Sequence, residues 1–86
     1  MFALNWSNYA LDRLADIYVA ATLDEQARIA AGVDALNARL RSDPLNEGES
    51  RSGAYRLTFT PLLSIGFYVT VADRTVQVTR VTRYGK

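Results

Sequence analysis

Residues 55–84 decide the fold, and they read YRLTFTPLLSIGFYVTVADRTVQVTRVTRY. Apolar and polar side chains alternate along this stretch, most clearly over residues 63–71. Such a period of two is typical of strands with one buried face. The alternation breaks at Thr60-Pro61 and at Asp73-Arg74, where the residue types favour turns. The sequence therefore predicts three consecutive strands joined by two short turns.

The first and last of these strands carry details that bear on function. In the first strand, the alternation assigns Tyr55 and Phe59 to the core. In the last strand, Val81 is out of phase with the valines that precede it. A β-bulge near Thr79 or Arg80 would insert one extra residue and so bring all the valines to one face.

Upstream of the strands, apolar residues recur at spacings of three and four, which indicates two helices. Ser7 is a suitable cap for the first helix, which is expected to run to about Ala21. Thr22 and Glu25 form a capping-box pattern at the start of the second. Asp43-Pro44 ends that helix, because the residue before a proline avoids the α conformation. The short link between them predicts an antiparallel helical hairpin.

Residues 2–6 alternate in character and predict a short first strand, whereas the polar, glycine-containing residues 45–53 predict a loop. The expected order is β-α-α-β-β-β. This order predicts a single α+β domain over residues 1–86, built in two layers. In it the helical hairpin packs on one face of a mostly antiparallel four-stranded sheet.

The composition excludes several classes of site. The chain has no Cys and no His, so it forms no disulfide, no thiolate metal site and no Ser-His or Cys-His nucleophile. It also lacks a P-loop and a dinucleotide-binding fingerprint, and its carboxylates are typical of helix surfaces. We therefore expect neither a cofactor nor a metal. The longest apolar stretch, residues 62–72, is too short to span a bilayer, and no signal peptide is recognisable, so the expected location is the cytoplasm, away from any membrane.

A formal net charge of +1 conceals an uneven distribution. Residues 1–50 hold eight carboxylates and four arginines, a net charge of −4, whereas residues 51–86 hold six basic residues and one aspartate, a net charge of +5. This imbalance indicates that the C-terminal half binds an anion. The alternative is that helix surfaces tolerate acidic residues while strands disfavour them.

The sheet face predicted to lie away from the helices carries cations, hydroxyls and a phenol, and no carboxylate. Its expected members are Arg56, Thr58, Ser64, Gly66, Tyr68 and Thr70, with Arg80 or Arg83 depending on the bulge. Guanidinium groups bind phosphate oxygens bidentately, and Tyr68 or Tyr84 is suited to stack on a base. The alternative is that these arginines merely keep a sheet surface soluble.

Four residues at the C-terminus form a second basic cluster, Arg80, Arg83, Tyr84 and Lys86. One interpretation is a phosphate clamp in which Tyr84 transfers a proton. The other is a frayed basic tail.

An ordered set of residues along the chain resembles the RelE/ParE superfamily of bacterial toxins. The set comprises Leu40, Asp43, Pro44, Gly48, Glu49, Gly53, Tyr55, Arg56 and Leu57, followed by the run Gly66-Phe67-Tyr68-Val69 and residues 76–81. The resemblance covers nearly the whole chain and implies a β-α-α-β-β-β toxin encoded beside an antitoxin.

RelE-like members of this superfamily cut messenger RNA on the ribosome, whereas ParE-like members poison DNA gyrase. By resemblance to the RelE-like pattern, the expected catalytic residues are Arg56, Arg83 and Tyr84. The expected substrate-binding residues are Arg51, Tyr68, Arg80 and Lys86. The sequence departs from that pattern, because Ile65 or one of its neighbours stands where a third-strand arginine belongs, and Thr58 stands where a second cation of the second strand belongs.

These departures affect the chemistry. Cleavage by the RNA 2′-hydroxyl needs a base, positive charge for the phosphorane and an acid for the leaving oxygen. Arginine supplies the charge, but its pKa above about 12 makes it a poor base. Proton transfer is then left to Tyr68, Tyr84 and Lys86, so the full catalytic set is not visible. The first expectation is a RelE-like toxin acting on ribosome-bound mRNA. The alternatives are a ParE-like gyrase inhibitor and a decayed member that only binds its antitoxin.

Overall fold

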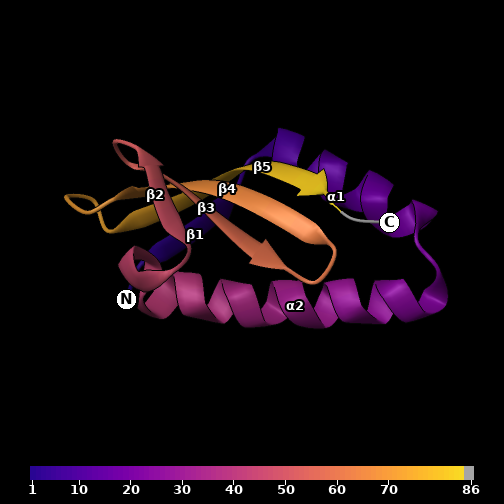
Figure 1. The fold of residues 1–86 in the computed structure, drawn as a ribbon. Helices are drawn as coiled ribbons and strands as arrows, with labels where there is room; N and C mark the ends of the chain where they lie inside the picture. Colours follow the sequence, from indigo (N-terminus) through magenta and orange to yellow (C-terminus); the bar gives the residue numbers. More distant parts are fainter. Residues whose placement is uncertain (85–86) are drawn as a thin grey trace.

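The computed structural model describes residues 1–84, which form two helices against one sheet (Figure 1). The elements are β1 (Ala3–Trp6), α1 (Asn8–Ala20), α2 (Leu23–Ser42), the 3₁₀ turn η1 (Pro44–Asn46), β2 (Glu49–Ser52), β3 (Tyr55–Thr60), β4 (Leu63–Thr70) and β5 (Thr75–Arg83). The α+β class and the helical hairpin are as the sequence predicts. No helix within residues 1–84 is long and apolar enough to cross a membrane.

The sheet has five strands in the order β1-β5-β4-β3-β2, with β1 parallel to β5 and the other pairs antiparallel. The prediction of a four-stranded sheet is therefore wrong. Part of the expected loop, Glu49–Ser52, pairs with β3 and forms an edge strand. All its residues are exposed and polar, so it shows no alternation of the kind that reveals a strand with one buried face.

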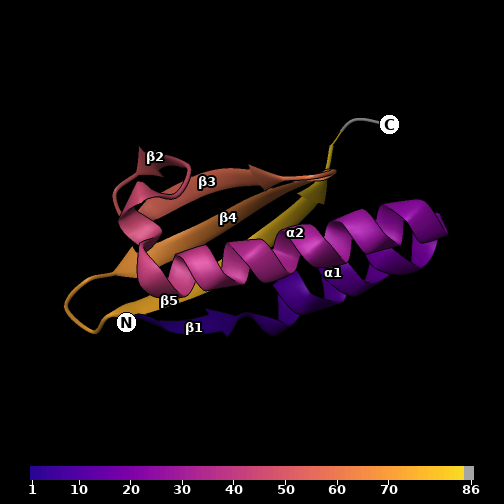
Figure 2. The ribbon, with the colours of Figure 1, turned by 90° about the horizontal axis from the view of Figure 1, so that it is seen from below.

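Both helices begin as the sequence predicts. The Ser7 hydroxyl accepts a hydrogen bond from the Ala10 amide at 3.1 Å, and Thr22 and Glu25 form a reciprocal capping box. The two helices lie side by side on one face of the sheet (Figure 2). At its other end, α2 is joined to β1 by the Trp6 indole, which donates to the Asn37 side chain at 3.0 Å.

The core lies between the helices and one sheet face. It consists of Ala10, Ile17, Ile29, Leu36, Leu40, Leu63, Ile65, Phe67, Val69, Val76, Val78 and Val81. The bulge predicted in the last strand is confirmed, because Gly66 pairs with Arg80 while Phe67 pairs with Val78, which leaves Thr79 as the extra residue. The bulge thus buries valines on both sides of it on the same face.

The side chains of β3 lie on the opposite faces of the sheet from those predicted. Its two-residue turn to β4 pairs Thr60 with Leu63 and Thr58 with Ile65, and partners across a strand pair share a face. Both threonines are therefore buried beneath the helices, while Phe59 is 55% exposed on the other face. The prediction that Phe59 belongs to the core is wrong, because the turn fixes the register regardless of which face of β3 is more apolar.

Two glycines with positive φ offer a matched test of this arrangement. Gly48 (φ +65) faces the β3 backbone, and a Cβ built on it would lie 2.2 Å from the Leu57 carbonyl oxygen. Gly53 (φ +56) has open space at the same position. Gly53→Ala should cost about 1 kcal/mol of unfolding free energy, the usual cost of a left-handed alanine. Gly48→Ala should cost at least about 1 kcal/mol more, because strand β3 must also move. Urea unfolding measures both, and equal losses would contradict the packing of β2 on β3.

Candidate nucleic-acid interface

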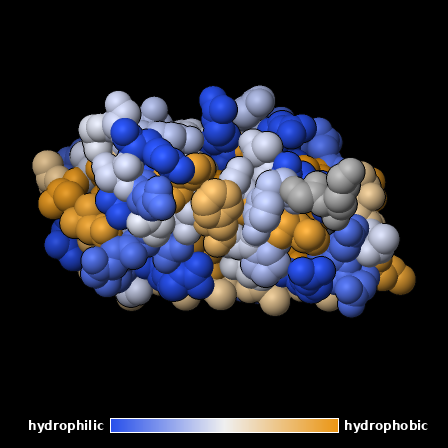
Figure 3. Space-filling model, viewed as in Figure 1, coloured by the Kyte–Doolittle hydropathy of each residue, from blue (hydrophilic) through white to orange (hydrophobic). Residues whose placement is uncertain are grey.

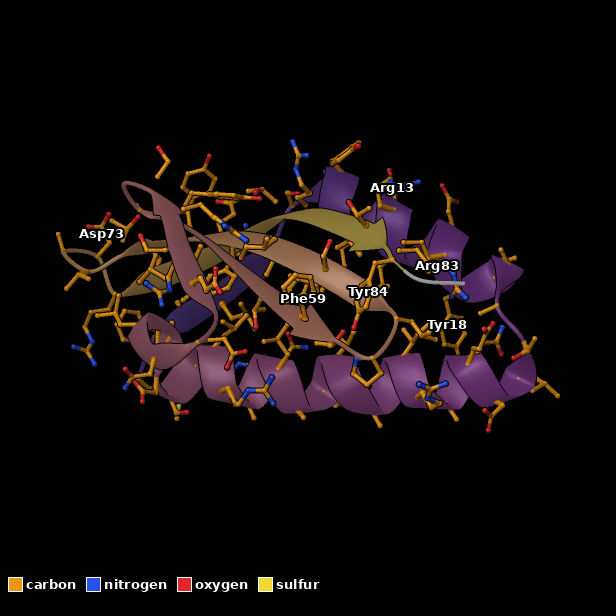
Figure 4. The ribbon with its side chains drawn as sticks, in the orientation of Figure 1. Arg13, Tyr18, Phe59, Asp73, Arg83 and Tyr84 are labelled. Carbon is orange, nitrogen blue, oxygen red and sulfur yellow. The ribbon has the colours of Figure 1, made fainter. Side chains whose placement is uncertain are left out.

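The sheet face away from the helices is largely uncovered, and we call it the open face. Strand pairing assigns it the side chains Tyr55, Leu57, Phe59, Ser64, Tyr68, Gln77, Arg80 and Thr82. Phe59 and Tyr84 lie next to each other at the end of this face that is near the β3–β4 turn (Figure 4). Seen from the same side, hydrophobic patches are set among hydrophilic side chains (Figure 3). The open face therefore mixes aromatic rings with polar groups.

A hollow on this face is lined by Tyr9, Tyr55, Tyr68, Thr79 and Arg80, and we call it the tyrosine hollow. The rings of Tyr55 and Tyr68 are 5.0 Å apart between centroids and tilted by 53°. Arg80 is exposed, and no carboxylate among residues 1–84 pairs with it. The hollow thus combines three phenols with an uncompensated positive charge.

Gly66 explains how Tyr55 reaches this position. The hydroxyl end of its ring lies over Gly66, so close that a Cβ there would be 1.9 Å from the Tyr55 hydroxyl oxygen. Any side chain at position 66 would therefore push the ring away. Arg80 pairs with Gly66 across the strands, next to the bulge at Thr79. The glycine and the bulge together bring Tyr55 and Arg80 to the same place.

Arg56 does not lie on the open face, and the prediction that it does is wrong. It occupies the helix-facing side of β3, opposite Phe67, because of the register that the turn imposes. Its Nε donates to the Glu47 carbonyl oxygen at 3.0 Å and its Nη2 to the Gly48 carbonyl oxygen at 3.2 Å. The structure therefore uses this cation to fasten the segment between α2 and β2.

The same segment is held by the Glu47 carboxylate. It accepts hydrogen bonds from Arg39 at 2.7 Å and from the Thr58 hydroxyl at 2.6 Å. Burial raises the pKa of Glu47, but the hydrogen bonds from Arg39 and Thr58 and the charges of Arg39 and Arg56 outweigh it, so the pKa lies below its ordinary value. Glu47 is thus the centre of a polar cluster that joins Arg39 and Thr58 through its carboxylate and Arg56 through its carbonyl oxygen.

Arg83 and Tyr84 also have partners within the fold. Arg83 points to the helix side and pairs with Glu25 at 3.0 Å, near the start of α2 (Figure 4). A backbone hydrogen bond from Thr22, and next the one from Arg83, hold the pKa of Glu25 below its ordinary value. Tyr84 packs edge-on against Phe59 at 5.4 Å, and its hydroxyl donates to the Thr60 carbonyl oxygen at 3.0 Å.

The seven residues expected at the site therefore fall into separate places. Tyr68 and Arg80 share the tyrosine hollow. The three expected catalytic residues lie apart from one another: Arg56 is bonded to the Glu47 carbonyl, Arg83 to Glu25 and Tyr84 to the Thr60 carbonyl. Arg51 lies on the exposed edge strand β2 and pairs with Glu49 at 3.5 Å, and Lys86 lies outside the described residues. Residues 1–84 contain no cluster of three or more carboxylates that could hold a metal.

Three residues of the hollow are not among the predicted site residues: Tyr9, Tyr55 and Thr79, the extra residue of the bulge. The alternation of residues 55–59 predicts that Tyr55 lies in the core, whereas the two-residue turn after Thr60 places it on the open face. Tyr9 comes from the first turn of α1, and no local pattern relates it to the strands.

A second surface feature is a groove of about 350 Å³ along the outer side of the helical hairpin. It is almost entirely apolar, and its lining residues are Leu11, Leu14, Ala15, Tyr18, Val19, Ile29, Ala30, Val33 and Asp34. Leu11 is 47% exposed and Val19 is 78% exposed. Large apolar side chains gathered in this way indicate a surface for a partner.

Comparison with known proteins gives structural matches only. No family model and no curated protein matches the chain. A structure described as the chromosomal ParDE TA system from P. aeruginosa matches with a TM-score of 0.74 and 19% identity, covering 99% of this chain and 98% of that one. The RelBE2 toxin–antitoxin complex from Mycobacterium tuberculosis matches with a TM-score of 0.75 and 16% identity, over 99% and 93%. The isolated E. coli RelE toxin gives 0.67 and 12%, over 100% and 87%. The chain therefore shares its fold with these toxin–antitoxin structures along its whole length.

The two arginines of interest should differ in their effect on stability. Arg56→Ala removes the donors to two backbone carbonyls and a charge beside Glu47, so it should lower the unfolding free energy by about 2 kcal/mol. Arg80→Ala, at an exposed position without a partner, should change it by no more than about 0.5 kcal/mol. Urea unfolding of the two variants makes the comparison, and an Arg56 variant as stable as the Arg80 variant would refute the anchoring role.

Acid should destabilise the chain through Glu47. Its pKa in the folded chain lies below the ordinary value of 4.5, so the ionised carboxylate stabilises the fold fully above that value and the contribution is lost as the pH falls. The urea midpoint should therefore drop between about pH 6 and about pH 3, and it should drop less in Glu47→Gln. Glu49→Gln, on the exposed edge strand, serves as the control and should behave like the unchanged chain. An undiminished drop in Glu47→Gln would contradict this assignment.

Proposed function

We propose that this chain is the toxin of a type II toxin–antitoxin pair. The observation that carries the proposal is the fold match, which runs along the whole of this chain and almost the whole of the ParDE and RelBE2 chains. Both of those structures are described as toxin–antitoxin systems or complexes. A protein encoded beside this chain is the expected antitoxin.

The hairpin groove is the surface that we assign to the antitoxin. Its exposed apolar side chains lose water contact when a partner covers them, and burying such surface contributes about 25 cal/mol per Å². The groove follows two helices and is open along its length, so an amphipathic helix suits it. Leu11 and Val19 are then contact residues whose exposure makes them replaceable without loss of the fold.

The first candidate target is ribosome-bound mRNA, as in a RelE-like toxin. It is supported by the gathering of Tyr55, Tyr68 and Arg80 on a face where no carboxylate lines the hollow. Aromatic rings and arginine are the groups that hold single-stranded RNA. Arg56, Arg83 and Tyr84 do not contribute to this hollow, so the proposal rests on binding and leaves the proton-transfer group unassigned.

The second candidate is gyrase inhibition, as in a ParE-like toxin. The dispersal of Arg56, Arg83 and Tyr84 favours it, because an inhibitor that binds a protein needs a surface and no catalytic set. The two candidates make opposite statements about which cellular process stops first.

Induced expression in a bacterial host tests both levels of the proposal. Growth should stop on induction and resume when the adjacent reading frame is co-expressed. Under the first candidate amino-acid incorporation falls before thymidine incorporation, and under the second the order is reversed. Continued growth with high levels of folded chain would refute the toxin.

Variants in the groove separate the antitoxin surface from the toxic activity. Leu11→Asp and Val19→Asp should keep the growth arrest but lose the rescue, because a carboxylate cannot be buried against an apolar helix without a large cost. Val71→Asp is the control. The exposed fraction of Val71, 55%, lies between those of Leu11 and Val19, but Val71 is on the turn before β5, so this variant should retain the rescue. Rescue that is unaffected by either groove variant would exclude the groove as the antitoxin surface.

A further inference from the structure

We infer that a pocket at the junction of α1, α2 and β5 binds a free α-amino acid with an aliphatic side chain, and we call it the junction pocket. Its volume is about 280 Å³, and its lining residues are Arg13, Asp16, Ile17, Ala20, Glu25 and Arg83. It shares no lining residue with the hairpin groove or the tyrosine hollow. The inference therefore does not depend on the proposed toxin function.

Three elements build the junction pocket. Helix α1 contributes residues at spacings of three and four, which lie along one side of the helix: Arg13, Asp16, Ile17 and Ala20. Glu25 belongs to the first turn of α2, and Arg83 is the last residue of β5. Arg83 pairs with Leu63, which is buried beneath the helices, so its side chain lies on the helix side of the sheet. Figure 4 shows Arg13 on α1 and Arg83 at the end of β5 in the same part of the molecule.

An ion pair within the fold fixes one wall of the junction pocket. The Arg83 Nη2 donates to the Glu25 Oε2 at 3.0 Å, and the Glu25 Oε1 accepts a hydrogen bond from the Thr22 amide at 3.0 Å. Both carboxylate oxygens of Glu25 are therefore held before any ligand arrives. Arginine has five N–H donors, and within residues 1–84 the guanidinium of Arg83 makes this one hydrogen bond. The wall thus combines a set position with donors that a ligand carboxylate can use.

Arg13 and Asp16 supply the charges that the fold itself leaves uncompensated. Arg13 is half-buried, yet in the part of the chain that the structure describes it forms no ion pair, and neither does Asp16. A cation that is partly out of water and has no counter-charge is costly, and a ligand that brings the counter-charge lowers that cost. The complementary ligand groups are therefore a carboxylate for Arg13 and an ammonium group for Asp16.

The charge balance of the lining selects a zwitterion. The lining holds two arginines and two carboxylates, so its net charge is zero. A phosphate would meet Asp16 and Glu25, and a polyamine would meet both arginines, so repulsion disfavours each of them. An α-amino acid carries its carboxylate and its ammonium group on one carbon atom. Residues three apart on a helix have Cβ atoms about 5–6 Å apart, so such a ligand contacts Arg13 and Asp16 together.

The size and the apolar part of the junction pocket indicate which amino acids fit. Sites for drug-sized ligands measure about 300–1,000 Å³, so this pocket suits a smaller molecule. Ile17, which is 7% exposed, and Ala20 provide the apolar surface. An aliphatic side chain packed on them leaves water, which favours binding. L-leucine has this combination of groups and is the probe that we choose.

Titration of the purified, isotope-labelled chain with L-leucine tests the inference, with the backbone amide signals followed by NMR. The signals of Ile17, Ala20 and Glu25 should move saturably, at about millimolar leucine, because a small ligand makes few contacts. Isocaproate lacks the ammonium group of leucine and isoamylamine lacks its carboxylate, so each should bind at least about tenfold more weakly. The absence of a saturable shift, or equal binding of either analogue, would overturn the site.

Variants on α1 identify the groups that hold leucine. Arg13→Gln and Asp16→Asn should each weaken binding at least about tenfold, because one charge of the zwitterion loses its partner. Asp12→Asn on α1 and Arg28→Gln on α2 are the matched controls, since both positions are exposed and neither lines the junction pocket. Both controls should bind leucine as the unchanged chain does, and unmoved signals from strand β4 verify the fold of every variant. Equal weakening in a control and in the pocket variant of the same charge would overturn the site, because the overall charge would then be responsible.

Discussion

The two-residue turn between β3 and β4 is the constraint on which the rest of the molecule depends. It pairs Thr60 with Leu63, and from that pair every residue of β3 is assigned to one face or the other. The assignment has a cost: Leu62 takes a left-handed conformation with φ 72°, and the buried Thr60 hydroxyl has no partner among the described residues. In return, β4 places Leu63, Ile65, Phe67 and Val69 in the core without a break.

The register also determines what each arginine does. With Arg56 and Thr58 on the helix side, both side chains need hydrogen-bond partners next to the core. Glu47 accepts from Arg56 through its carbonyl oxygen and from Thr58 through its carboxylate. The loop that carries Glu47 is thereby fastened to β3, which allows β2 to pair along the sheet edge. Tyr55 is turned outward by the same register and meets Arg80. The register that this turn imposes therefore gives Arg56 a structural role and brings Tyr55 to the same face as Arg80.

Sequence reasoning succeeds where a local interaction specifies the structure. Ser7, Thr22 and Glu25 cap their helices through hydrogen bonds to residues three positions away, and the phase of Val81 reveals the bulge. It fails where the decision is made at a distance. The polar run Glu49–Ser52 carries no pattern that predicts its pairing with the edge of β3. Tyr9 lies in the hollow only because of the path that the chain takes from β1 into α1. Alternation along β3 predicts that its more apolar face, which carries Tyr55 and Phe59, lies in the core. The turn to β4 instead places that face outward.

The position of β5 in the sheet affects how the chain folds during its synthesis. This strand is the last in sequence, yet it lies inside the sheet, between β4 and β1. β1 pairs with β5 alone, beginning with Ala3 opposite Thr75. Until β5 has been synthesised, β1 therefore has no neighbour in the sheet, and the core lacks the valines of β5. Contacts between such distant positions make folding slow compared with folding through local contacts. A ribosome synthesising this chain thus carries an incomplete sheet until residues 75–83 have emerged, and the open face is assembled only then.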